Sequence, residues 1–96
     1  MKENILLICP PCGDKNWSLQ LYKSTWELHN HLKIIVQNVN MCETSNFKPL
    51  GLFIQGDTKD WTMIEMWSDN ELLFMDFCEH VSDILNIPLE YLAHPV

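Results

Sequence analysis

The sequence predicts an α+β fold, a two-layer sandwich in which an antiparallel four-stranded sheet has two helices packed on one face. The first observation is a near-repeat at an offset of 44 residues, in which the Lys-Asn-Trp of residues 15–17 returns as Lys-Asp-Trp at residues 59–61. The second is a Ser-x-x-Glu capping-box pattern that follows each copy, at Ser24 and at Ser68. Each half is therefore expected to contain two strands and a helix, and the order ββα–ββα favours a layer of helices on a sheet.

A length of 96 residues suits one domain with one hydrophobic core. Within the single domain of residues 1–96 we expect two pseudo-repeats, at about 4–40 and 49–86, related by a pseudo-twofold axis. Residues 87–96 are expected to add a short helical turn and a tail.

The first half divides into two strands and a helix. A strand is expected over residues 4–8, and the two prolines of residues 9–13 end it because proline cannot donate a ladder hydrogen bond. Residues 17–21 alternate apolar and polar side chains, which is typical of a half-buried strand. From Ser24 to about Asn40 the apolar side chains recur every three or four residues, as on one side of a helix. This apolar stripe comprises Leu28, Leu32, Ile35, Val36 and Val39.

The second half repeats this order. A strand over residues 50–55 and a strand over residues 61–67 are expected to form a hairpin around the turn at residues 56–60. The last long helix is predicted to begin at Ser68 and to end at Asn86. Its apolar stripe comprises Phe74, Phe77, Val81 and Leu85.

Charge and hydropathy exclude several classes of function. The net charge is −7, the chain has no Arg, and residues 49–96 carry a single Lys against nine acids. Binding to nucleic acid needs clustered cations, so we expect no nucleic-acid partner. The apolar run near the N-terminus is too short for a signal peptide, and no stretch approaches the roughly 20 apolar residues of a membrane span. With four cysteines, the chain is therefore predicted to be cytoplasmic and not to bind a membrane.

The sharpest local motif is Cys9 and Cys12 with two prolines between them, a spacing at which two thiols can form a disulfide. The motif resembles the CPPC centre of thioredoxin-like proteins. The resemblance implies one helix over residues 13–33 and a strand over residues 33–39. It also implies that Cys9 is the attacking thiol, Cys12 the resolving thiol and Pro49 the residue that docks the substrate.

Other catalytic or metal-binding patterns are absent from the sequence. His29 and His31 are two residues apart, so they do not share a face of a helix, and no second Cys-x-x-Cys is present. The chain has no nucleophile elbow, no phosphate loop and no zinc-protease motif. We therefore predict no metal, no cofactor and no hydrolytic chemistry.

The strongest remaining signal is a surplus of large apolar side chains in the last predicted strand. Trp61, Met63 and Trp67 point to one side of it, and Ile64 and Met66 to the other. If the helices cover one face of the sheet, the other face keeps large side chains exposed. Exposed clusters of Trp and Met are typical of a partner site.

The sequence therefore predicts a small acidic binding module without catalytic chemistry, which binds through an exposed apolar sheet face. A homodimer and a basic protein are the expected partners, and a small apolar ligand is a further candidate for the same face. A charged rim is expected to speed association, and it comprises Asp69, Asp76, Glu79 and Asp83. Two other interpretations stay open: a thiol–disulfide protein that uses Cys9 and Cys12, and an acidic inhibitor that mimics DNA.

Overall fold

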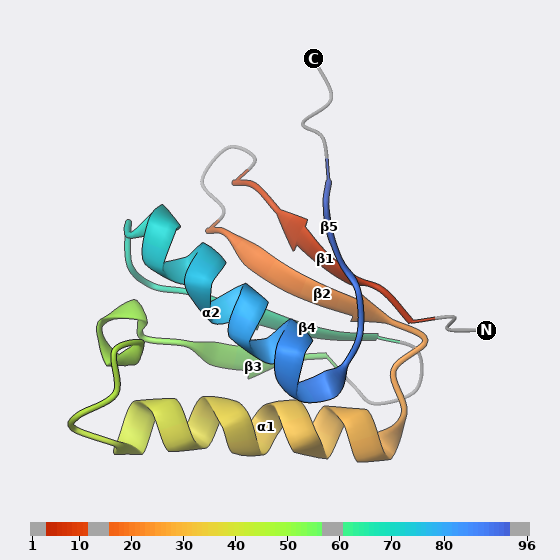
Figure 1. Ribbon diagram of the computed structural model, residues 1–96, viewed down its shortest axis with the longest axis horizontal. Helices are drawn as coiled ribbons and strands as arrows, with labels where there is room; N and C mark the ends of the chain where they lie inside the picture. Colours follow the sequence, from red (N-terminus) through yellow and green to blue (C-terminus); the bar gives the residue numbers. More distant parts are fainter. Residues whose placement is uncertain (1–3, 12–15, 57–60, 93–96) are drawn as a thin grey trace.

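The computed structural model describes residues 4–11, 16–56 and 61–92. Within them the chain forms an α+β fold with a five-stranded mixed sheet and two α-helices (Figure 1). The elements in chain order are β1 (Leu6–Cys9), β2 (Ser18–Tyr22), α1 (Trp26–Met41), the 3-10 helix η1 (Lys48–Leu50), β3 (Phe53–Gln55), β4 (Trp61–Glu65), α2 (Glu71–Leu85) and β5 (Leu89–Tyr91).

The sheet has the strand order β3-β4-β2-β1-β5. β2 lies antiparallel to both β1 and β4, β3 lies antiparallel to β4, and β5 lies parallel to β1. The prediction of four antiparallel strands is therefore wrong, because a fifth strand makes the sheet mixed. The order strand, strand, helix does occur twice, but η1 and β5 have no counterpart in the other half of the described chain. The internal duplication stays a prediction.

β5 replaces the helical turn that was expected after α2. Asn86 caps the C-terminus of α2, and its φ of 54° lies in the left-handed region, so the chain turns away from the helix axis. It then runs beside β1, where the amide of Leu6 donates to the carbonyl of Pro88 at 2.9 Å and the amide of Leu92 donates to the carbonyl of Ile8 at 2.9 Å. Proline cannot donate in a ladder but accepts in one, so Pro88 does not prevent this pairing.

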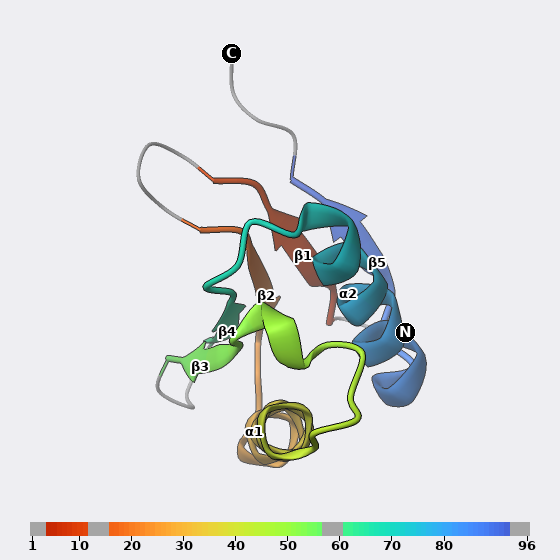
Figure 2. The ribbon, with the colours of Figure 1, turned by 90° about the vertical axis from the view of Figure 1, so that its left-hand side faces the viewer.

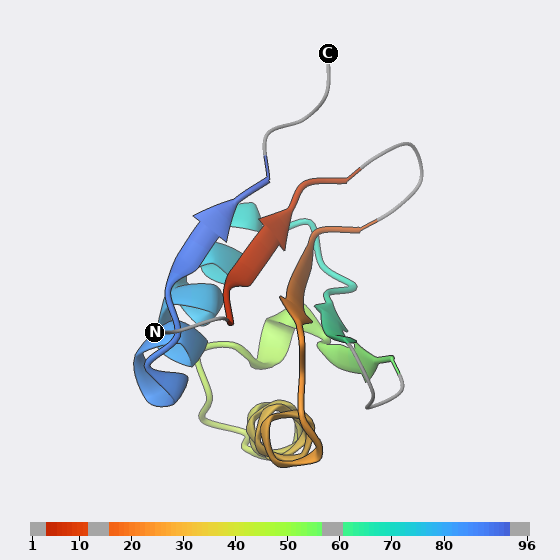
Figure 3. The ribbon, with the colours of Figure 1, turned by 90° about the vertical axis from the view of Figure 1, so that its right-hand side faces the viewer.

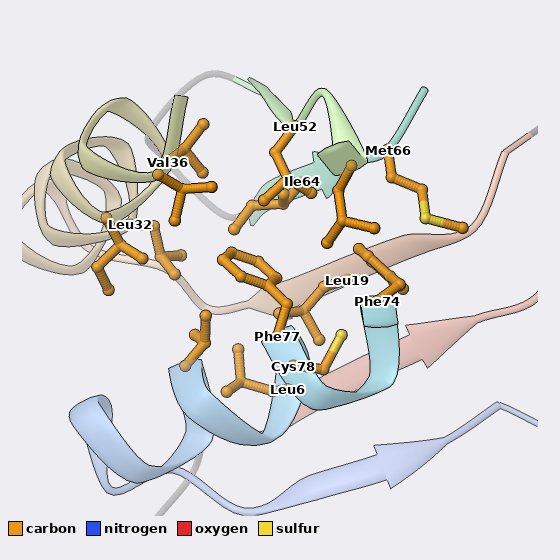
Figure 4. Packing of buried hydrophobic residues seen from close by; sticks show 14 of the residues in the cluster. Leu6, Leu19, Leu32, Val36, Leu52, Ile64, Met66, Phe74, Phe77 and Cys78 are labelled. Carbon is orange, nitrogen blue, oxygen red and sulfur yellow. The ribbon is translucent and has the colours of Figure 1, made fainter. Parts of the chain in front are cut away.

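Both helices lie on one side of the sheet, as Figure 2 shows with α1 seen end-on. Alternate side chains of the strands point toward these helices and are buried with the apolar stripes of α1 and α2 (Figure 4). The core residues labelled there include Leu6, Leu19 and Ile64 from the sheet, Leu32 and Val36 from α1, and Phe74 and Phe77 from α2. Alternation in the strands and the 3.6-residue period in the helices thus converge on one core.

The helices are capped one and two residues later than the capping boxes predict. The side chain of Thr25 accepts a hydrogen bond from the amide of Leu28 at 3.2 Å, and that of Asn70 accepts one from the amide of Leu73 at 3.1 Å. Ser24, the predicted first cap, is buried and bonds to a sheet residue instead. A neighbouring side chain of the same capping type takes its role in each case.

The thioredoxin-like element order is not present. Residues 18–22 form β2, where the resemblance implies part of a helix over residues 13–33. The implied strand over residues 33–39 lies within α1. The two-residue alternation of β2 explains the difference, since Leu19 and Leu21 are both buried on the helix side.

Candidate functional site

The sheet face that points away from α1 and α2 is called the open face below. Within the described ranges neither helix covers it, and in Figure 3 α2 lies behind β5 and β1. The strand registers place on it the side chains that alternate with those of the core. These residues are Leu7, Cys9, Ser18, Gln20, Tyr22, Phe53, Gln55, Trp61, Met63, Glu65 and Glu90, and four of the eleven are aromatic or Met. The open face is thus the side of the sheet that neither α1 nor α2 covers, and it mixes large apolar side chains with polar ones.

Trp67 adds the most exposed aromatic ring to this face. Phe53 pairs with Glu65, which places Phe53 on the open face, and the ring of Trp67 lies 4.9 Å from that of Phe53 at an interplanar angle of 47°. The amide of Trp67 donates to the carbonyl of Leu50 at 2.9 Å, which holds its backbone beside the chain that leads into β3. The side chain is nevertheless 72% exposed. Trp67 is therefore held in place by its backbone and by one ring contact while most of its surface meets solvent.

A close backbone approach beside Trp67 requires a glycine. Gly51 has a φ of +56°, and a Cβ added to it would lie 3.2 Å from the Cβ of Trp67. Both the left-handed backbone and the short distance favour a residue without a side chain. Gly51 thus lets the chain turn under Trp67 without pushing the ring away.

A second aromatic pair lies at the opposite end of β4. Trp61 faces Tyr22 across the β2–β4 ladder, and these side chains are 37% and 51% exposed. The hydroxyl of Tyr22 donates to the side-chain oxygen of Gln20, its neighbour on the same face. Met63 pairs with Gln20 in the middle of the sheet. On this face Trp61 and Met63 therefore lie along β4, and Glu65 separates them from Trp67.

A shallow pocket of about 210 Å³ lies on the same face, where β1 begins and β2 ends. It is lined by Ile5, Leu7, Tyr22, Lys23 and Glu90. The first three side chains give it an apolar floor, and the last two place one positive and one negative charge at its border. The pocket and Trp67 lie at opposite corners of the open face.

The structure brings together only part of the predicted site. Trp61, Met63 and Trp67 share the open face, with Ile64 and Met66 buried beneath them. Asp69 follows Trp67 and is exposed. The other predicted rim residues, Asp76, Glu79 and Asp83, are exposed on α2, which packs on the opposite side of the sheet. These three acids therefore do not border the apolar patch.

Sequence reasoning missed the aromatic partners Phe53 and Tyr22 and the pocket. The alternation of β2 and β3 carried the signal for both side chains, because each is separated by an even number of residues from another open-face residue of its strand. The pocket depends on Glu90, which reaches this face because β5 is a strand beside β1.

Burial of Cys9 does not favour the reactive thiolate that the thioredoxin-like resemblance implies for it. Cys9 ends β1 and is buried, and this burial raises its pKa against the lowering effect of a hydrogen bond with Ser18. Cys12, its predicted partner, lies outside the described residues. Pro49 is exposed within η1. A thiolate nucleophile needs the opposite shift at Cys9.

Two further thiols lie outside the predicted motif. Burial raises the pKa of Cys78 far above its usual range, so this core thiol stays protonated. Cys42 is exposed, and a hydrogen bond with the Thr44 hydroxyl is the largest of the effects that lower its pKa. Cys42 is therefore the described thiol with the most thiolate character at neutral pH.

The described residues contain no group of three or more His, Cys, Asp or Glu side chains placed to hold a metal ion. Their helices are too short or too polar to cross a membrane.

Of the two helices, α1 carries the single acid Glu27 and α2 carries Glu71, Asp76, Glu79 and Asp83. Mimicry of DNA predicts acids on both helices, whereas the acids of the described helices are concentrated on α2.

No protein-family model matches the chain, and no significant match was found among curated proteins or solved structures.

Proposed function

We propose that this protein acts by binding, as a small cytoplasmic module without catalytic chemistry that presents the open face to a protein partner. The observation that carries the proposal is the exposure of Trp67, which keeps 72% of its surface in solvent while its backbone and Phe53 hold it in place. A cytoplasmic location is part of the proposal, because Cys9, Cys42 and Cys78 are free thiols, as is usual in a reducing compartment.

The composition of the open face supports a protein partner. Trp, Tyr, Phe and Met are enriched at protein interfaces, while charged side chains are depleted from their centres. On this face Gln20 and Glu65 lie among Trp61, Met63 and Trp67, and Lys23 and Glu90 lie beside the pocket. Large apolar side chains with few charges among them are typical of such an interface.

A small apolar ligand fits this face less well than a protein does. Pockets that bind small molecules usually measure about 300 to 1,000 Å³, whereas the pocket on the open face measures about 210 Å³. A shallow pocket of this size suits a single anchoring side chain of a partner. The acids of α2 could attract a basic partner, but α2 packs on the side of the sheet opposite the open face. They therefore form a surface separate from the open face.

Radical footprinting tests the proposal and does not require the partner to be identified. Oxidative labelling of Trp67 and Met63 is compared between cells that express the protein and the dilute purified protein. We expect labelling of both residues to fall severalfold in cells, because a partner covers the open face. Trp26 is the matched control, since it is 66% exposed on α1 and lies outside the open face. Equal labelling of Trp67 in both samples, with Trp26 unchanged, would show that nothing binds there.

A further inference from the structure

We propose that the partner of the open face is the open face of a second copy, in a twofold-symmetric dimer in which Trp67 of each copy enters the pocket beside Ile5 and Leu7 of the other. This inference rests on the proposed function, because it names the partner for the same surface. Four features of the face carry it: a projection and a recess on one surface, the placement of both, the distribution of charge, and the exposed apolar area.

A twofold interface uses the same patch of both copies, so each projection needs its recess within that patch. Trp67 is the projecting side chain of the open face, and the pocket of about 210 Å³ is its recess. A cavity of about 150 Å³ accepts one benzene ring. The pocket therefore has room for the larger indole ring, and its floor of Ile5, Leu7 and Tyr22 is apolar.

The positions of projection and recess define how the two sheets cross. β1 and β4 run in the same direction, since each is antiparallel to β2. Trp67 follows the end of β4 near the β3 edge, whereas the pocket lies at the start of β1 near the β5 edge. They occupy the ends of one diagonal, so a twofold axis that exchanges them lies between the two sheets and perpendicular to that diagonal. The strands of the two copies then cross obliquely, because the line from Trp67 to the pocket is inclined to the strands.

This axis passes near the middle of the sheet, where Gln20 pairs with Met63. Each of these residues meets its own counterpart in the second copy. Met adapts its shape to an irregular contact, and the amide of Gln20 can both donate and accept. Gln20 and Met63 are thus suited to contact their own counterparts at the centre of the interface.

The distribution of charge also favours a second copy on this face. The acids Asp76, Glu79 and Asp83 of α2 lie on the layer behind the sheet, so they point away from the second copy. Entry of Trp67 into the pocket brings the exposed Asp69 of one copy toward Lys23 of the other, twice in the dimer. Lys23 also offsets the charge of Glu90 at the same border.

Exposed aromatic side chains supply part of the area that a stable contact needs. An aromatic side chain offers roughly 150 to 250 Å², so Trp67, Tyr22 and Trp61 at their exposures of 72%, 51% and 37% offer on the order of 300 Å² together. A standard interface buries about 800 Å² on each partner. Three side chains thus supply a large share, and the rest of the face lies around them.

Sedimentation velocity of the purified full chain over a concentration series tests the inference. We expect a monomer–dimer equilibrium whose dissociation constant rises at least about thirtyfold in Trp67→Ala, as for an interface Trp that fills a pocket of its partner. Trp26→Ala, which removes an exposed Trp from α1, is expected to leave the constant unchanged. Circular dichroism checks the fold, and Trp67→Gln provides a second variant at the same position.

A second pair of variants tests the recess. Ile5→Glu places a charge at the pocket and is expected to abolish the dimer, whereas Ile34→Glu on the exposed side of α1 is expected to leave it intact. A dimer that survives both Trp67→Ala and Ile5→Glu overturns the inference, because its contact lies elsewhere. A monomer at every concentration also overturns it. If Trp67 is still protected in cells, the proposed function stands with another partner; if Trp67 is labelled equally, both proposals fail.

Discussion

The hydroxyl oxygen of Thr62 lies 3.0 Å from Nδ1 of His29 and 2.9 Å from the hydroxyl of Ser24, so one β4 side chain bonds to both residues at the start of α1. Thr62 and Ser24 are buried. Thr62→Val keeps the shape of the side chain but leaves buried polar groups without this partner. We expect the free energy of unfolding to fall by about 1 to 3 kcal/mol, measured by urea unfolding.

Thr44→Val is the matched control for this variant. Thr44 is exposed in the loop after α1, and its hydroxyl contacts only an exposed thiol among its described hydrogen bonds. Substitution there is expected to change stability by no more than about 0.5 kcal/mol. Equal losses in the two variants would mean that the buried hydroxyl of Thr62 contributes nothing specific.

Gly51 permits the turn that leads from η1 to β3 beneath Trp67. We expect Gly51→Ala to destabilise the protein by about 1 to 2 kcal/mol, because an L-residue is strained at a φ of +56°. The new Cβ would also lie 3.2 Å from the Cβ of Trp67, so the indole emission is expected to shift as the ring moves. Thermal unfolding and Trp fluorescence measure the two effects.

Gly51→Asn separates backbone strain from crowding. Asn tolerates the left-handed region better than Ala but carries the same Cβ. Its loss of stability is expected to be smaller, while the fluorescence shift stays similar. If Gly51→Ala and Gly51→Asn lower the free energy of unfolding equally, backbone strain at Gly51 does not cause the loss of stability.

As the pH is raised, the described thiols are expected to react with iodoacetamide one after another, in a defined order. The thiolate is the reactive form, so a lowered pKa moves the midpoint of the rate–pH profile to lower pH and a raised pKa moves it higher. Hydrogen bonding lowers the pKa of Cys42 and burial raises that of Cys9, so Cys42 is alkylated first. Cys78 should react only after unfolding. Mass spectrometry of modified peptides follows each site, and a faster Cys9 would favour the redox interpretation.

Local pattern was sufficient to predict most of the fold. Alternation located β2 and β4, and the 3.6-residue period located α1 and α2, because burial on one side imposes these periods. It failed at β5, where Pro88 and the short segment after Asn86 resemble a helix restart. Pairing with β1 is a long-range contact between distant parts of the chain, and no local period records it.

In the candidate site, too, local pattern predicted some features, whereas others depend on long-range contacts. The side of the strand on which Trp61, Met63 and Trp67 lie followed from their spacing. Their relation to the acids of α2 did not, since it depends on which face of the sheet α2 covers. The pocket was equally hidden, because Glu90 reaches it only through the pairing of β5 with β1.

A pair of proline substitutions tests whether β5 is a paired strand. The bonds made by Pro88 and Leu92 imply that alternate residues of β5 direct their backbone groups toward β1, so the amide of Glu90 points toward β1 and that of Tyr91 toward the free edge. Glu90→Pro therefore removes a ladder hydrogen bond, whereas Tyr91→Pro removes none.

We expect Glu90→Pro to cost about 1 kcal/mol more than Tyr91→Pro, the usual net contribution of one backbone hydrogen bond. Urea unfolding compares the two, and amide hydrogen exchange at Leu6 and Ile8 reports whether β1 has lost its neighbour. Tyr91→Pro also removes the contact between the Tyr91 hydroxyl and Met75, so Tyr91→Phe is measured beside it to subtract that loss. Equal costs after this correction would contradict the pairing, because an unpaired segment has no inward and outward amides to distinguish.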